Sequence, residues 1–245
     1  MGCFQSYTKW QQEQITISTI SQNLGYNNYN YKIPLKVFHR YFPFISLTKA
    51  ELIECLNKLQ ISFHNPFYSM FIISHYELKY IKTLDFYNKY PQVLEKKSYS
   101  VKKLSTLAII LGKGKLSSKA KSLFDIYNFN DNLILNEKDL GLMIENICDV
   151  SILCLPNYAE MHKAEIGETT KIVKDHYCAL KIKYCEYFKE LIFIIKGQGE
   201  FTKERFVKEL EDPDVGILLD DQRLRAFIAD QYNNKSAIQN NTRDR

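Results

Sequence analysis

The sequence predicts an all-α protein, and three observations support this fold class. Apolar residues recur at helical spacing, as in the stripe from Ala120 to Tyr127. A second stripe with the same spacing runs from Leu140 to Ile147, after a loop of twelve residues. Glycine and proline are scarce, with nine and six in 245 residues, which favours long helices over many turns.

The loop between these stripes, Asn128 to Asp139, has the length and the apolar eighth residue, Leu135, of an EF-hand loop. The stretch FDIYNFNDNLILNEKDL resembles the third EF-hand of the calcineurin B and neuronal calcium sensor group. The preceding LAIILGKGKLSSKAK is similar to the link between the second and third hands of that group. The resemblance implies four helix-loop-helix units in two pairs, over about residues 33 to 230.

The third loop lacks the ligand chemistry of an active calcium site. Calcium binds six to eight oxygens, which come from carboxylates early in the loop and a bidentate Glu at its twelfth place. Here the candidate ligands are three neutral amides and one short acid: Asn128, Asn130, Asn132 and Asp139. The sixth place, where a Gly makes the sharp turn, holds Leu133. We therefore expect weak calcium binding or none, and no other cofactor.

The other three predicted hands keep the apolar frame and lose the carboxylates. Their eighth and twelfth places hold Leu47 and Glu51 in the first hand, Tyr99 and Lys103 in the second, and Phe201 and Arg205 in the fourth. The second hand is expected to begin at Asn65 with a long aromatic helix through Phe71, Tyr76, Tyr80 and Leu84. A single Glu cannot hold a hard cation, and a Lys or Arg at the twelfth place repels one.

The chain divides into four parts on this interpretation: a tail over 1–32, a first pair over 33–112, a second pair over 113–230 and a polar tail over 231–245. The stretch from Tyr7 to Tyr31 is rich in Gln, Asn and Ser without a sustained period, so we expect it to order only against a partner, with Trp10 as its anchor. Residues 148–168 contain Pro156 and are expected to form an irregular surface insertion followed by a new helix.

The N-terminal MGCFQS has the Gly-x-x-x-Ser frame of N-myristoylation at Gly2, and Cys3 beside it is a candidate for palmitoylation. One acyl chain holds a membrane only marginally, so the second would make attachment durable. Six residues are a short match, and an unmodified N-terminus can also begin this way.

The net charge is +5, and a basic middle region contains Lys96, Lys97, Lys102, Lys103, Lys113, Lys115, Lys119 and Lys121. These lysines form either a solvated surface or a region that an anionic membrane or an acidic polymer attracts. No zinc-finger, RNA-recognition or basic-zipper pattern occurs, so no nucleic-acid partner is expected.

The six cysteines include no Cys-x-x-Cys pair and follow no secretory leader, and reduced thiols are expected. The five histidines are scattered without zinc spacing.

No nucleotide-binding, kinase, hydrolase or metalloprotease motif occurs, so catalysis is not expected. Two hypotheses remain: a calcium-independent adaptor or structural subunit that binds a helix of a larger assembly, and a weak calcium sensor acting through the third hand. The adaptor would lie on the cytoplasmic side of a membrane through Gly2 and Cys3, or in a cilium, axoneme or other cytoskeleton. The many apolar side chains either line a groove for an amphipathic helix or fill the core.

Overall fold

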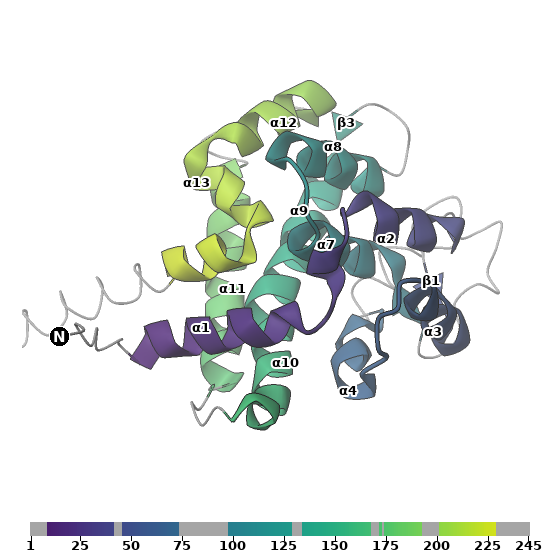
Figure 1. The fold of residues 1–245 in the computed structure, drawn as a ribbon. Helices are drawn as coiled ribbons and strands as arrows, with labels where there is room; N and C mark the ends of the chain where they lie inside the picture. Colours follow the sequence, from purple (N-terminus) through teal and green to yellow (C-terminus); the bar gives the residue numbers. More distant parts are fainter. Residues whose placement is uncertain are drawn as a thin grey trace, which may run out of the picture.

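The computed structural model describes residues 9–41, 46–73, 98–128, 134–167, 172, 174–192 and 201–228. Within them the fold is helical apart from short two-stranded pairings and isolated bridges, which confirms the all-α prediction (Figure 1). The helices are α1 (Lys9–Gln22), α2 (Lys32–Phe38), α3 (Lys49–Lys58), α4 (Asn65–Tyr68), α7 (Val101–Leu111), α8 (Leu116–Tyr127), α9 (Glu137–Cys148), α10 (Leu155–His162), α11 (Lys174–Glu190), α12 (Lys203–Glu211) and α13 (Pro213–Gly216). Residues 221–228 are also helical and are called the C-terminal helix below.

The strands are two residues long and pair antiparallel. β1 (Ser46–Leu47) pairs with β2 (Tyr99–Ser100), and β3 (Ile134–Leu135) pairs with β4 (Phe201–Thr202). Each pairing joins two segments that are far apart in the sequence, so the strands tie distant parts of the chain together.

Helix α7 lies at the centre of the molecule, with α2, α8 and α9 packed around it (Figure 1). Every residue from Val101 to Ile110 is buried, including Lys102 and Lys103. The polar residues of a helix that is buried on all sides need partners inside the protein. The apolar residues of both halves of the chain therefore join in one core.

The expected surface insertion at 148–168 is instead mostly a continuation of helix. A π-helical stretch, η5 (Asp149–Cys154), connects α9 directly to α10, and a short 3₁₀ turn, η6 (Lys163–Ile166), follows α10. Pro156 lies in the first turn of α10, directly after the π-helical stretch, and the helix continues through it. Ile152, Leu155 and Tyr158 are buried, so the prediction of an irregular surface segment was wrong.

The expected N-terminal tail is also largely structured. Residues 9–22 form α1, which packs against α10, and Ile17 and Ile20 are completely buried. Trp10 stacks on Tyr177 of α11 with ring centroids 5.8 Å apart, so it does anchor this segment, but within the same chain. The apolar face of α1 is narrow and its polar residues bond to other helices, which explains why no period was evident in the sequence.

The aromatic helix expected from Asn65 is short where the structure describes it. α4 ends at Tyr68, a 3₁₀ turn follows over η3 (Ser69–Phe71), and Ile72 is extended. Tyr76, Tyr80 and Leu84 lie outside the described residues.

Candidate functional site

The four residues at the predicted eighth places meet two by two in the strand pairs. Leu47 is the partner of Tyr99, and Leu135 is the partner of Phe201. All four side chains are buried. The apolar spacing in the sequence thus corresponds to a common structural position, at which one loop is paired with another.

The residue after each of these positions caps the helix that follows. The side chains of Thr48, Ser100, Asn136 and Thr202 accept a hydrogen bond from the backbone N–H three residues later, at 2.9–3.3 Å. These capped amides belong to the residues at the predicted twelfth places. A Ser, Thr or Asn cap satisfies an N–H group that would otherwise lack a partner, so the start of each helix is set locally.

Glu51, at the first twelfth place, is bound to its own helix cap. Its Oε2 accepts hydrogen bonds from the Thr48 backbone N–H at 2.7 Å and from Thr48 Oγ1 at 2.9 Å. This reciprocal arrangement is a capping box, which stabilises the start of α3. The Glu51 carboxylate, which would be the twelfth-place ligand of a calcium-binding loop, instead caps the first turn of α3.

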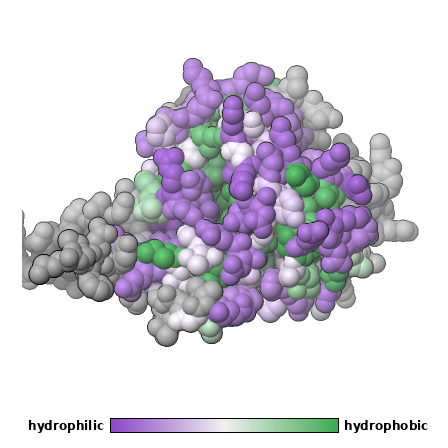
Figure 2. Space-filling model, viewed as in Figure 1, coloured by the Kyte–Doolittle hydropathy of each residue, from purple (hydrophilic) through white to green (hydrophobic). Residues whose placement is uncertain are grey.

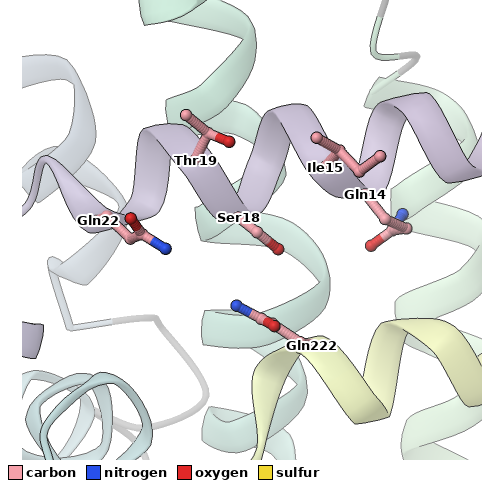
Figure 3. A pocket seen from close by; sticks show the side chains of 6 residues that line it. All are labelled: Gln14, Ile15, Ser18, Thr19, Gln22 and Gln222. Atoms are coloured by element: carbon pink, nitrogen blue, oxygen red, sulfur yellow. The ribbon is translucent and has the colours of Figure 1, made fainter. Parts of the chain in front are cut away.

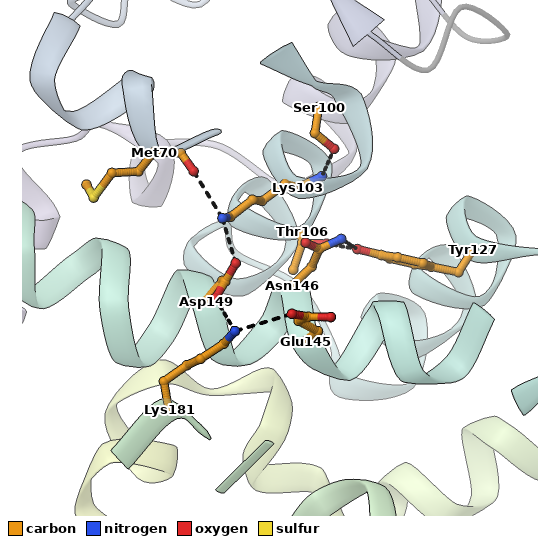
Figure 4. Close-up of polar contacts among 9 residues, drawn as sticks. All are labelled: Met70, Ser100, Lys103, Thr106, Tyr127, Glu145, Asn146, Asp149 and Lys181. Carbon is orange, nitrogen blue, oxygen red and sulfur yellow. Dashed lines mark hydrogen bonds and ion pairs between the residues drawn. The ribbon is translucent and has the colours of Figure 1, made fainter. Parts of the chain in front are cut away.

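Lys103, at the second twelfth place, connects three elements (Figure 4). Its Nζ donates to the carboxylate of Asp149 at 2.7 Å and to the Met70 carbonyl oxygen at 3.0 Å. Asp149 also pairs with Lys181 of α11 at 3.0 Å, and Lys181 pairs with Glu145 at 3.3 Å. The ammonium group of Lys103 therefore supplies the positive charge next to these oxygens, in place of a metal ion.

The charges in this network shift one another's pKa values. Burial raises the pKa of Asp149, but Lys103 and Lys181 outweigh that effect and hold the pKa below its ordinary value. Burial lowers the pKa of Lys181, while Asp149 and Glu145 together raise it above its ordinary value. Both groups therefore stay charged at neutral pH, and the ion pairs link α7, η5 and α11.

Asp139, at the third twelfth place, is 2% exposed and bonded to the cap residue of its own helix. Its Oδ2 accepts from Asn136 Nδ2 at 2.6 Å, and its backbone N–H donates to Asn136 Oδ1 at 2.9 Å. At the other end of this loop, the buried Oδ1 atom of Asn128 has no hydrogen-bond partner among the described residues. Asn130, Asn132 and Leu133 lie outside the described residues.

Arg205, at the fourth twelfth place, lies against its own loop. Its guanidinium carbon is 5.0 Å from the centroid of the Phe201 ring, a cation–π contact. A positive charge at this place opposes a bound cation.

A buried polar cluster joins α7, α8 and α9 beside this frame (Figure 4). The hydroxyl of Tyr127 lies 2.9 Å from Thr106 Oγ1 and accepts from Asn146 Nδ2 at 2.8 Å. The Nζ of Lys102 lies 4.8 Å from the centroid of the Tyr127 ring. Lys102 and Lys103, expected on a solvated surface, are therefore core residues, and Lys119 is also buried and donates to the Ile110 carbonyl oxygen at 3.0 Å.

Arg225 holds α1 against the rest of the molecule. This side chain is 1% exposed and pairs with Asp221 at 2.8 Å. Its Nε donates to Gln14 Oε1 at 2.8 Å and its Nη1 to the Ser151 carbonyl oxygen at 3.2 Å. Sequence reasoning did not find this residue, because its partners lie 74 and 211 positions away.

A shallow hollow of about 370 Å³ lies between α1 and the C-terminal helix (Figure 3). Its lining consists of Gln14, Ile15, Ser18, Thr19, Gln22 and Gln222. The lining offers amides and hydroxyls but no acid, base or thiol, so it holds no set of groups for acid–base or nucleophilic chemistry.

Two of the histidines expected to be scattered lie close together. The ring centroids of His64 and His162 are 5.1 Å apart, and His162 Nδ1 lies 2.7 Å from Glu165 Oε1. Burial and the neighbouring His162 lower the pKa of His64. No three His, Cys, Asp or Glu side chains are arranged to hold a metal ion in the part of the chain that the structure describes.

The candidate lipidation residues Gly2 and Cys3 lie outside the described residues. No helix in the described part of the chain has the length and apolar character needed to cross a membrane. No protein-family model, curated protein or solved structure matches this chain.

Proposed function

We propose that this chain is a non-catalytic, largely calcium-independent adaptor or structural subunit built from four degenerate EF-hand units in two pairs. The proposal is supported by three features that recur at the same spacing in all four units: a buried apolar residue in a strand pair, a helix cap after it, and a capped amide three residues later. A common spacing of these features is typical of repeated helix-loop-helix units rather than of four unrelated helix starts.

The proposed calcium independence rests on one observation. The side chain at each twelfth place is engaged in another contact: Glu51 and Asp139 with their own caps, Lys103 with Asp149, and Arg205 with a Phe ring. An EF-hand needs this side chain as a bidentate ligand. A protein that uses it for helix capping and ion pairs keeps its shape without the ion.

The partner is proposed to be another protein in a larger assembly, an amphipathic helix or a cytoskeletal component. Most apolar side chains of the described residues are in the core, and the large exposed ones are Ile15, Ile33, Leu116, Met161, Ile182 and Tyr187. The visible face is mostly hydrophilic with separate apolar spots (Figure 2). These features favour a rigid subunit over a sensor that opens an apolar groove.

A calcium titration by calorimetry tests this function against the alternative, a weak sensor acting through the third hand. The buried Oδ1 of Asn128, which has no partner among the described residues, is the one observation that favours the sensor. We expect no saturable heat and no change in the fluorescence of Trp10, the only Trp in the chain. Saturable heat that Asn128→Ala abolishes would support the sensor instead.

Residence at a membrane or in a cytoskeleton can be tested on the tagged native protein beside its Gly2→Ala variant. Cells are separated into a detergent-soluble membrane fraction and an insoluble cytoskeletal fraction before purification. Release of the variant alone from the membrane fraction would support anchoring through Gly2 and Cys3. Retention of both proteins in the insoluble fraction would support a subunit of a cilium, axoneme or other filament assembly.

A further inference from the structure

Two long stretches of this chain contain no acidic residue. No Asp or Glu occurs between residues 14 and 50, and none occurs between residues 96 and 124. The first stretch includes Lys32 and Lys36 of α2, and the second includes Lys113 and Lys115 in the GKGK link between α7 and α8. A surface built from both stretches is basic unless other elements supply acids.

The structure places these two stretches against each other. The backbone N–H of Lys113 donates to the Tyr29 carbonyl oxygen at 2.9 Å, and the N–H of Tyr31 donates to the Lys113 carbonyl oxygen at 3.1 Å. The Tyr31 hydroxyl donates to the Ser118 carbonyl oxygen at 2.8 Å, which holds the start of α2 beside α8. The GKGK link thus lies next to the first turn of α2.

The two glycines of the link make this close approach possible. A Cβ at Gly112 would lie 2.7 Å from Tyr31 Cα, and a Cβ at Gly114 would lie 2.6 Å from the Tyr31 ring. Both distances are shorter than any real Cβ contact, so only glycine allows the chain to lie on Tyr31. The intervening Lys113 and the following Lys115 are exposed.

Lys32, Lys36, Lys113 and Lys115, called the basic face below, are all exposed. None of the four forms an ion pair with a residue that the structure describes. Lys32 and Lys36 are one helical turn apart, a spacing at which like charges repel. The side chains of Asp125 and Asp221, on elements nearby, are already paired with Lys203 and Arg225.

We propose that the basic face binds an acidic polypeptide segment of the partner. This inference rests on the proposed function as a subunit of a protein assembly. Clustered lysines without internal counter-ions attract a negatively charged partner, and a flat charged surface needs no pocket to bind an extended acidic segment.

An anionic membrane is less well supported as the occupant. Surfaces that enter a bilayer present several large apolar side chains. In the described parts of α2, the GKGK link and α8, the large apolar side chains that are exposed are two: Ile33 on α2 and Leu116 at the start of α8. The start of α1, through which an acylated N-terminus would connect, lies across the molecule from α2 (Figure 1).

The test is the binding of a fluorescein-labelled oligoglutamate peptide, measured by anisotropy on the full-length chain. The face variant carries Lys32→Glu, Lys36→Glu, Lys113→Glu and Lys115→Glu. The control variant carries Lys58→Glu, Lys138→Glu, Lys208→Glu and Arg223→Glu, which changes the net charge equally at exposed sites on other helices. Circular dichroism confirms that both variants fold.

We expect the face variant to lose about tenfold or more in affinity and the control variant to stay within about twofold. Wild-type binding should weaken with added salt, because the Debye length is only about 8 Å at physiological ionic strength. An equal loss in both variants would show an effect of net charge alone and would overturn the proposal.

Two further arms separate the possible failures. Co-sedimentation of wild type with phosphatidylserine-containing vesicles, in the absence of peptide binding, would replace the acidic segment by a membrane surface. If a partner co-purifies equally with wild type and the face variant, the basic face is not its site and the proposed function stands. If no partner co-purifies with wild type, the proposed function fails, while the peptide titration still decides whether the face binds acidic chains.

Discussion

The two strand pairs share one register and differ in what their twelfth residues do. In the first pair, Glu51 closes its own cap while Lys103 reaches Asp149 in the other half of the chain. In the second pair, Asp139 accepts a hydrogen bond from Asn136 and Arg205 lies against the Phe201 ring, and both of these contacts are within one unit. The comparison shows that the same position after a strand can serve the local helix or join two halves of a fold, depending on the charge and reach of its side chain.

Among the single substitutions, removal of the Asp149 carboxylate should lower stability most, because it breaks the ion pair by which Lys103 of the first pair reaches the other half of the chain. Asp149→Ala leaves the ammonium groups of Lys103 and Lys181 mostly buried with fewer counter-charges. We expect the free energy of unfolding in urea to fall by about 3 kcal/mol. Glu145→Gln, which changes the longer 3.3 Å contact of Lys181, should cost less than about 1 kcal/mol and is the control. Equal costs would mean that the link between the halves does not depend on Asp149.

The second junction between the halves is the GKGK link, and Gly112→Ala tests it. The added Cβ would lie 2.6 Å from the Ala108 carbonyl oxygen and 2.7 Å from Tyr31 Cα. Overpacking of this kind costs about 1–3 kcal/mol, measured by chemical denaturation. Gly141→Ala, in α9 with no atom within 4 Å of the new Cβ, should instead stabilise by about 0.5–1 kcal/mol. A stable Gly112→Ala protein would contradict the close packing on Tyr31.

The caps offer a comparison of the two pairs at equivalent positions. Thr48 forms a capping box with Glu51, whereas Thr202 accepts one bond from the Arg205 amide. Thr48→Ala should cost about 1–1.5 kcal/mol in thermal or urea unfolding, and Thr202→Ala about 0.5–1 kcal/mol. The reverse order would mean that the reciprocal bond of Glu51 adds nothing to the stability of α3.

A drop in pH should give the smallest effect on stability. It protonates the Asp149 carboxylate and so tests its charge while the side chain stays in place. The pKa of Asp149 is lower in the folded protein than its ordinary value. Its contribution to stability is therefore complete above the unfolded pKa of about 3.9 and is lost as pH falls through the folded pKa. Unfolding free energies compared at neutral pH and near pH 3 should fall more for wild type than for Asp149→Asn. Equal losses of unfolding free energy in the two proteins would contradict the lowered pKa of Asp149.

Local chemistry explains which features could be predicted from the sequence. The spacing of Leu135 and its equivalents and the burial of Leu123 and Phe124 follow from apolar periodicity over a few residues. Caps such as Thr48 and Asn136 act within one helical turn, so they are also readable from a short segment.

The errors occurred where distant residues decide the outcome. The segment 9–22 shows no clear stripe, yet it is a packed helix because Arg225 and Tyr177 supply partners for its polar side chains. The segment 148–168 contains Pro156, yet it continues a helix because α1 covers its apolar residues. Neither partner can be inferred from the segment itself.

The sequence by itself determined the helical class and the common spacing of the four apolar strand residues and their helix caps, because these depend on residue types at short spacing. Only the tertiary structure decided that Lys102, Lys103 and Lys119 are buried while Lys113 and Lys115 are exposed. A lysine on a helix has the same local chemistry in either place. Whether it becomes an internal counter-ion or part of a binding face depends on which elements pack around it.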